Sequence, residues 1–465
     1  MATATVETGQ LTDRELMAHL FRRAGIGASQ EELEAALVRG YEATVDQLLH
    51  PERQPELDED LIFRYYVDFH ESRKIDSAMS HWVYRMINTH RPLEEKMTLF
   101  WHCLFATGNS KVEAPPTMLQ QINTFRRFAL GNFRDILVDL SKDPAMIFWL
   151  DNNENTRTVY NENYGRELLE LFSMGIGNYT EDDVKECARA FTGWTFKNPI
   201  PAAKPYGRFK WEFEFRPDLH DYGEKTFLGE TGPFDGEEIV DIVVRQPATA
   251  QFLARRLYLF FVADRPDEAA IDELAEVYVQ SGYEIRSMLR SLFLSGYFRS
   301  RRAYYAMVKS PADYVVGLLR LAQDYRFPKP GIYDVAFECR YMGQDLLNPP
   351  SVEGWHTGKE WIDTGILVER VNFAASVVTD PSKPGIRKIV DTLRAAGDLV
   401  PEQFLDACLD ALGPLPVRPS TRAALLNHVE KQGPLRFASA DDPAATERVT
   451  ELLQLIGATR EFQFM

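Results

Sequence analysis

Residues 161–172 read NENYGRELLELF, and this stretch indicates the secondary structure that dominates the chain. On a helical wheel, Glu162, Arg166 and Glu170 fall along one stripe, while the leucines and Phe172 fall on the other side. Such spacing is typical of an amphipathic α-helix. Apolar residues recur with the same period along most of the chain, so the sequence predicts a mainly α, bundle-like protein of many helices.

Several helix starts are marked by capping residues. Thr180–Asp183 and Asp235–Glu238 each have the spacing of a capping box, and Ser310–Pro311 places proline at a first helical position. These three signals are independent of the apolar spacing and agree with it. They support the helical interpretation of the chain.

Two segments interrupt the helical pattern. Around residues 206–229, aromatic and polar residues alternate before a turn, which predicts an inserted β-hairpin or flap. A second break, rich in proline and glycine, lies at residues 380–385. We therefore expect a main helical domain over residues 1–379 and a C-terminal helical subdomain over residues 380–465.

Composition narrows the class of partner. The 465 residues include 69 acidic and 52 basic side chains, a net charge of −17, which disfavours a nucleic acid or an anionic membrane surface as the main partner. The four cysteines lie far apart without a CxxC pair, so they predict buried free thiols. There is no apolar core of a signal peptide near the start and no spanning segment of about 18 apolar residues. We expect a cytoplasmic protein unless another protein carries it.

The charged stripe of residues 161–172 is the first candidate site. Two alternatives remain: a solvated helix with i,i+4 ion pairs worth about 0.2–0.5 kcal/mol each, or a polar face turned into a cleft. In the second case Glu162, Arg166 and Glu170 would be catalytic, and Asn161 and Asn163 would bind substrate.

Histidines provide further candidates. His102 lies among aromatic residues of a predicted helix and is either a packed, hydrogen-bonded residue or a general base or ligand. His220 and Asp221 lie in a predicted turn, where they either act in catalysis or form an Asx-type turn. Together with the Glu162 stripe, these side chains could hold a divalent metal, although no ligand-pair motif such as HExxH is present.

Two more segments could bind substrate. The loop of residues 343–358 carries Trp355 and His356 between glycines and prolines, and it is either a wall for a ring-containing ligand such as a sugar or a plug over the core. Arg22 and Arg23 could bind an anion or pair with the acidic excess. The chain contains no nucleophile elbow, P-loop or dinucleotide fingerprint, which disfavours those chemistries.

Six motifs in order along the chain carry a family resemblance. They are His19–Gly27, Phe100–Thr107, Asn161–Gly175, Tyr179–Trp194, His220–Gly229 and Asn348–Trp355. Over about residues 16–375, this chain resembles the bacterial family called domain of unknown function 1800. Cys103 stands where relatives more often have asparagine, and the missing signal differs from the many relatives that look exported.

The resemblance implies no established activity. It implies a possible partner, because genes of this family often neighbour those of an exported, sulfatase-like family. Two hypotheses follow. The first is an enzyme that gathers His102, the Glu162 stripe and His220–Asp221 for acid–base or metal-assisted hydrolysis of a polar, carbohydrate-like compound, with Trp194 and Trp355 among its substrate contacts. The second is a non-catalytic partner or maturation factor of the sulfatase-like neighbour.

Overall fold

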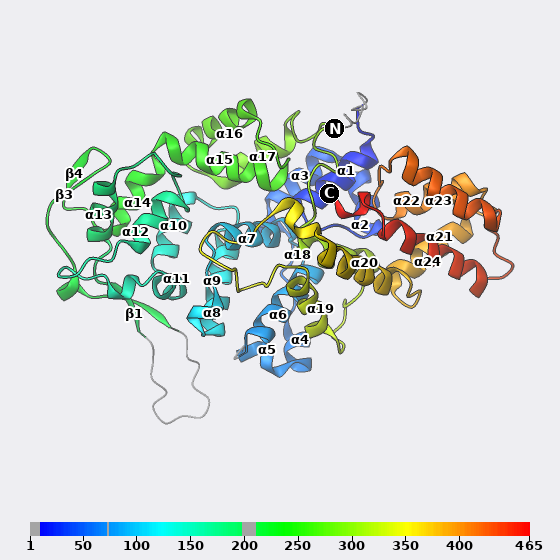
Figure 1. Cartoon of the computed structure of the whole chain (residues 1–465), viewed down its shortest axis with the longest axis horizontal. Helices are drawn as coiled ribbons and strands as arrows, with labels where there is room; N and C mark the ends of the chain where they lie inside the picture. The colour runs from blue at the N-terminus through cyan, green and yellow to red at the C-terminus, as the bar shows by residue number, and fades with distance from the viewer. Residues whose placement is uncertain (1–9, 72–73, 198–210) are drawn as a thin grey trace.

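The computed structural model describes residues 10–71, 74–197 and 211–465, and in these residues the chain is mainly helical (Figure 1). The predicted fold class is confirmed: the described residues form 24 α-helices and two small antiparallel sheets of two strands. The molecule is elongated. Helices α10–α14 lie at one end and α21–α24 at the other, with α1, α7 and α18 between them (Figure 1).

The first nine helices build the centre and one flank of the molecule. They are α1 (Asp13–Ala24), α2 (Gln30–Arg39), α3 (Tyr41–Leu49), α4 (Asp60–Tyr65), α5 (Val67–Glu71), α6 (Ile75–Asn88), α7 (Pro92–Leu104), α8 (Asn109–Val112) and α9 (Pro115–Arg127). Helix α7 packs against α1, α3 and α9. It is buried on nearly every side, which explains its many aromatic residues.

The next eight helices form the lobe that holds the predicted polar helix. They are α10 (Phe133–Ser141), α11 (Pro144–Trp149), α12 (Asn163–Glu170), α13 (Glu181–Ala190), α14 (Gly236–Val244), α15 (Pro247–Phe261), α16 (Glu268–Gln280) and α17 (Ile285–Leu294). Helices α12 and α13 pack together closely. At Gly165, an added Cβ would come within 3.1 Å of the backbone nitrogen of Ala188, so a larger residue would push α12 and α13 apart by a few tenths of an ångström.

The last seven helices return to the centre and then extend outward. They are α18 (Pro311–Ala322), α19 (Ile332–Tyr341), α20 (Thr364–Val378), α21 (Pro384–Ala395), α22 (Pro401–Ala411), α23 (Pro419–Gln432) and α24 (Pro443–Gly457). Helix α18 contacts α6, α19, α20 and α21, and α24 packs on α20. The division at residue 380 stays a prediction, although apolar side chains on both sides of it belong to one connected core.

Two of the four described strands, β2 (Glu212–Phe215) and β3 (Lys225–Phe227), lie within residues 206–229, where alternation predicted a hairpin, and their partners lie just outside this range. Strand β1 (Trp194–Lys197) pairs with β2, and β3 pairs with β4 (Glu230–Gly232). The pairing of β2 with a segment before residue 206 was not predicted. Residues 206–210 of the expected hairpin lie outside the described residues.

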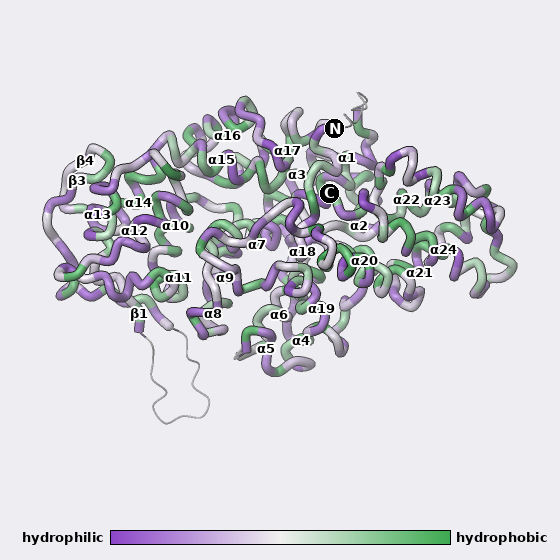
Figure 2. Tube along the Cα trace, viewed as in Figure 1, coloured by the Kyte–Doolittle hydropathy of each residue, from purple (hydrophilic) through white to green (hydrophobic). Residues whose placement is uncertain are grey.

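Local signals and burial agree along the chain. The predicted caps are present: Thr180 accepts a hydrogen bond from the amide of Asp183, Asp235 caps α14, and Ser310 caps α18 ahead of Pro311. Figure 2 shows apolar and polar residues alternating along most helices, as amphipathic helices around a core require. In the described part of the chain, no helix is both long and apolar enough to cross a membrane.

Candidate functional site

The polar face of α12 is a network of paired charges. The Arg166 guanidinium donates to both carboxylate oxygens of Glu181 at 2.9 and 2.7 Å and lies 3.3 Å from Glu162. Glu170 accepts a hydrogen bond from the hydroxyl of Tyr179 at 2.7 Å. Of the two i,i+4 pairs expected from the sequence, Glu162–Arg166 exists, whereas no ion pair within 4.0 Å joins Arg166 to Glu170 among the described residues. The closer partner of Arg166 comes from α13.

The two asparagines before α12 shape the start of the helix. Asn161 accepts from the backbone amide of Asn163 at 3.0 Å and donates from its side chain to the carbonyl of Asp151 at 3.2 Å. Behind them, Trp194 is buried and packs edge-on against Phe191. These contacts give Asn161 and Trp194 local structural roles.

Asp221 is also fully engaged by neighbours. It accepts from Arg189 at 2.8 Å, from the hydroxyl of Tyr160 at 2.9 Å and from the amide of Gly223 at 2.8 Å, the last being an Asx-type turn. The Arg189 hydrogen bond holds the pKa of Asp221 well below its ordinary value. His220 is buried, with Nδ1 2.8 Å from the carbonyl oxygen of Thr192.

His102 is buried in α7, away from these groups. Its Nε2 accepts a hydrogen bond from the backbone amide of Leu347 at 3.1 Å, and its ring lies edge-on to Trp82 and Trp355. Burial lowers the pKa of His102 to about 3, so the imidazole is neutral at pH 7. The geometry is that of the packed, hydrogen-bonded alternative.

The Trp355 loop is held against α7 by close backbone contact. Gly354 has φ of 88°, and a Cβ there would come within 2.7 Å of the carbonyl oxygen of Cys103. Trp355 is buried, whereas His356 is 78% exposed at its side chain and lies 3.5 Å from Glu360. The loop therefore covers the core with its tryptophan, whereas His356 points to solvent.

The expected catalytic residues thus fall into three places. Helix α13 links two of them, because its Glu181 holds Arg166 and its Arg189 holds Asp221. No hydrogen bond, ion pair or ring contact among the described residues joins His102 to either group. In the described part of the chain, no three His, Cys, Asp or Glu side chains are arranged to hold a metal.

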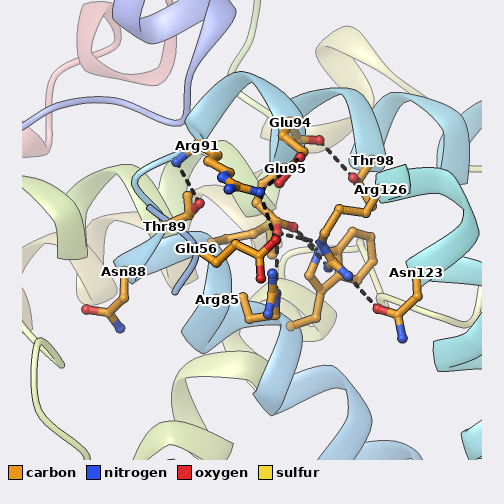
Figure 3. Close-up of polar contacts among 12 residues, drawn as sticks. Glu56, Arg85, Asn88, Thr89, Arg91, Glu94, Glu95, Thr98, Asn123 and Arg126 are labelled. Carbon is orange, nitrogen blue, oxygen red and sulfur yellow. Dashed lines mark hydrogen bonds and ion pairs between the residues drawn. The ribbon is translucent and has the colours of Figure 1, made fainter. Parts of the chain in front are cut away.

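A buried, paired charge centre surrounds Glu95 (Figure 3), and Trp82 of this centre contacts the ring of His102. Glu95 of α7 is 0% exposed and accepts from Arg126 at 2.7 Å, while Arg85 lies 3.4 Å away and Trp82 donates its indole N–H at 3.0 Å. Burial raises the pKa of the adjacent Glu94 to about 6, and the charge of Glu95 adds to this shift. Glu95 is not among the site residues predicted from the sequence.

Arg22 lines a cavity in the middle of the molecule. This cavity, about 80 Å³ in volume, lies where α1 and α18 meet the end of α22 and the C-terminal segment. Arg22 donates to the carbonyl of Gly413 at 2.9 Å, and its guanidinium lies 4.1 Å from the centre of the Tyr305 ring. Its Nε and Nη2 are buried without a hydrogen-bond partner among the described residues.

Lys309 and Asp313 line the same cavity. The amino group of Lys309 donates to the backbone carbonyl of Phe462 at 2.8 Å, and Asp313 is bound by Lys96. Arg370 is buried next to them and donates to the carbonyls of Lys309 at 2.6 Å and Trp361 at 3.0 Å. Burial lowers the pKa of Arg370 to about 10.

Arg23 adds another buried cation nearby but does not line the cavity. It donates to the carbonyls of Val262 and Ala303 at 3.2 and 2.8 Å, and two of its nitrogens have no partner among the described residues. Burial, followed by the charge of Arg22, lowers the pKa of Arg23 to about 9. Within the described chain, Arg22, Arg23, Lys309 and Arg370 have no carboxylate within 4.0 Å, so no ion pair balances these four basic side chains.

Sequence reasoning identified Arg22 and Arg23 but missed Lys309, Asp313 and Arg370. A signal was present, because the cap Ser310–Pro311 places Lys309 and Asp313 at the start of α18. Arg370 lies in the middle of α20, next to Glu369, where no local signal marks it. Only the fold brings these three together with Arg22.

Fold and site thus define a mainly helical protein with a paired Glu95 centre and a separate cationic cavity. The chain matches the family described as "Protein of unknown function (DUF1800)" over residues 19–464, and it belongs to that family. The match extends beyond the 16–375 stretch of the sequence resemblance and includes the C-terminal helices. No curated protein and no solved structure matches the chain.

Proposed function

We propose that this protein binds a small anionic group, carboxylate, phosphate or sulfate, in the cavity lined by Arg22 and Lys309. One observation carries the proposal: Arg22 lines the cavity with two buried nitrogens that have no hydrogen-bond partner, and neither Arg22 nor Lys309 has a carboxylate within 4.0 Å among the described residues. Burying unpaired charge is unfavourable, and an anion would offset that cost.

The proposal keeps the polar substrate of the enzyme hypothesis and changes where it binds. Hydrolysis by the Glu162 stripe and Asp221 would need an acid or base free to reach substrate. Instead, Glu162 pairs with Arg166, and Asp221 accepts a hydrogen bond from Arg189. His102 is buried and bound to a backbone amide. The cavity offers donors with fewer partners, so it is the better supported binding site.

The test measures unfolding temperature in acetate, phosphate or sulfate against chloride at equal ionic strength. A specific anion at about 100 times its dissociation constant should stabilise the fold by about 2.7 kcal/mol. Arg22→Gln and, separately, Lys309→Gln should remove the effect. Arg436→Gln, which loses the same charge from an exposed pair with Asp398, should retain it.

An equal response to chloride and the other anions would contradict the proposal. So would an anion effect that survives both Arg22→Gln and Lys309→Gln. Two separate variants are used because either one alone could disturb local packing.

A second function, as partner or maturation factor of a sulfatase-like protein, is favoured by an exposed apolar surface. Tyr65, Val67 and Tyr341 are each at least 50% exposed on α4, α5 and α19. The rings of Tyr66 and Tyr333 contact each other and join these helices on one flank. An anion effect that Arg22→Gln removes would favour the cavity function over this one.

A further inference from the structure

We infer that Lys309 is an amine nucleophile, forming an imine with the carbonyl carbon of a small oxo acid whose carboxylate is bound at Arg22. The inference rests on the proposed anion site and adds to it a substrate class and a covalent step. Lys309 lies outside the six sequence motifs and outside the Glu95 centre.

The surroundings of Lys309 suit an amine nucleophile. Its Nζ makes one hydrogen bond, to the carbonyl of Phe462 at 2.8 Å, and lies 4.0 Å from the centre of the Phe462 ring. In the described chain, no carboxylate lies within 4.0 Å to hold the group as an ammonium ion. An uncharged amine in this position could donate one N–H to the carbonyl and keep its lone pair for the cavity.

Neighbouring positive charges also favour the uncharged form of the Lys309 amine. Burial, and then the positive charges of Arg22 and Arg370, hold the pKa of Lys309 well below that of an ordinary lysine. Asp313 acts against this shift, but its carboxylate is already bound by Lys96 and by the hydroxyl of Ser310. Desolvation and adjacent cations are the two means by which proteins activate a lysine amine.

The volume of the cavity and the basic side chains that line it indicate which class of substrate could bind there. The cavity volume of about 80 Å³ is well below the about 300–1,000 Å³ of pockets that hold drug-sized ligands, so it suits an acid of two or three carbons better than a sugar. Arg22 and Lys309 line the same cavity, so a compound with a carboxylate next to a carbonyl could contact both. Small 2-oxo acids have that arrangement.

The covalent step balances without another reactant. The Nζ lone pair forms a bond to the carbonyl carbon, and one N–H proton moves to the carbonyl oxygen to give a carbinolamine. The hydroxyl then leaves with the second N–H proton as water, and a C=N double bond remains. The carboxylate takes no part in bond making and remains at Arg22.

A structural role for Lys309 is the competing explanation. Its side chain and its backbone amide bind the carbonyls of Phe462 and Gln463, so the residue also ties the start of α18 to the C-terminal segment. A purely structural lysine would not react with carbonyl compounds faster than other lysines.

The experiment traps the imine in the full-length protein. Protein is incubated near pH 7 with glyoxylate or pyruvate, reduced with borohydride, and digested, so that mass spectrometry locates the secondary amine. A pKa lowered by one unit raises the reactive neutral fraction about tenfold, so Lys309 should be labelled at least about tenfold faster than exposed lysines. Lys309→Arg should lose that label, whereas Lys388→Arg, at an exposed pair with Glu31, should retain it.

Two further measurements separate failure of the inference from failure of the anion site. Stabilisation by acetate, which has no reactive carbonyl, reports anion binding alone, and glycolaldehyde, which has no charge, reports amine reactivity alone. Binding of acetate without preferential labelling of Lys309 by any carbonyl probe would overturn the inference and leave the anion site intact. Labelling of Lys309 by glycolaldehyde without any anion effect would overturn the anion site and, with it, the oxo acid as substrate.

Discussion

The Glu95 centre and the Arg22 cavity both gather basic side chains in the interior, and these side chains have opposite kinds of partner. At the first, Arg85, Arg126 and an indole N–H converge on one buried carboxylate. At the second, Arg22 and Lys309 have backbone carbonyls as partners and no carboxylate within 4.0 Å among the described residues.

The difference separates structural charge from charge available to a ligand. A buried carboxylate with several donors leaves little capacity for a further partner, so the Glu95 centre is suited to holding α6, α7 and α9 together. Cations beside a cavity retain that capacity. Three changes would break or sharpen this contrast.

The largest expected effect is at the Glu95 centre. Glu95→Gln keeps the shape of the side chain but leaves Arg126 without its buried counter-charge and Arg85 with only Glu59, at 2.7 Å, which we expect to cost about 3–5 kcal/mol of unfolding free energy. Urea denaturation at pH 7 measures it. Glu56→Gln, at an 81% exposed side chain that pairs with Arg91, should cost less than about 1 kcal/mol. Equal losses in the two variants would remove the distinction between a structural centre and surface charge.

A smaller effect is expected at His102, whose ring contacts Trp82 of the Glu95 centre. Its pKa is about 3 in the fold and about 6.5 when unfolded, so between these values only the unfolded chain binds the proton and stability falls as pH falls. From pH 7 to pH 5 this residue alone should cost about 2 kcal/mol. His102→Gln, which can still accept from Leu347, should lose that part of the pH dependence. Urea denaturation of wild type and variant at pH 7 and pH 5 measures this difference. Equal changes in unfolding free energy in the two proteins would contradict a buried neutral imidazole.

The smallest effect is expected at the cavity itself. Lys309→Met removes no ion pair and only one hydrogen bond, to Phe462, so in chloride buffer it should change the unfolding free energy by less than about 1.5 kcal/mol. The same urea experiment measures it beside Glu95→Gln. A loss as large as that of Glu95→Gln would mean that Lys309 has a hidden structural partner and that the two regions are alike.

Local features of the chain were predictable because they depend on neighbours in sequence. The amphipathic stripe of α12 and the caps at Thr180, Asp235 and Ser310 were confirmed, since the groups involved lie within four residues of one another. Pairing of β1 with β2 was missed because its register joins segments on either side of residues 198–210.

For the site residues, the residue type indicated which side chains carry charge, but it did not indicate which residue each charge pairs with. Arg166 was expected to pair within α12, yet its two short hydrogen bonds go to Glu181 of α13. His102 and His220 could be named from the sequence, but their distance from each other and the identity of their hydrogen-bond partners could not. Both bind backbone groups of other segments, which have no signature in the side-chain pattern.

The sequence by itself determined the helical class, the starts of many helices and the family, because periodicity, capping and ordered motifs are properties of the chain. Only the tertiary structure decided which charges are paired. Arg22 of α1 and Lys309 before α18 are far apart in sequence and become neighbours through the packing of α1, α18 and the C-terminal segment around one cavity. Electrostatic interaction depends on separation in space and on burial, and neither quantity can be read from residue order.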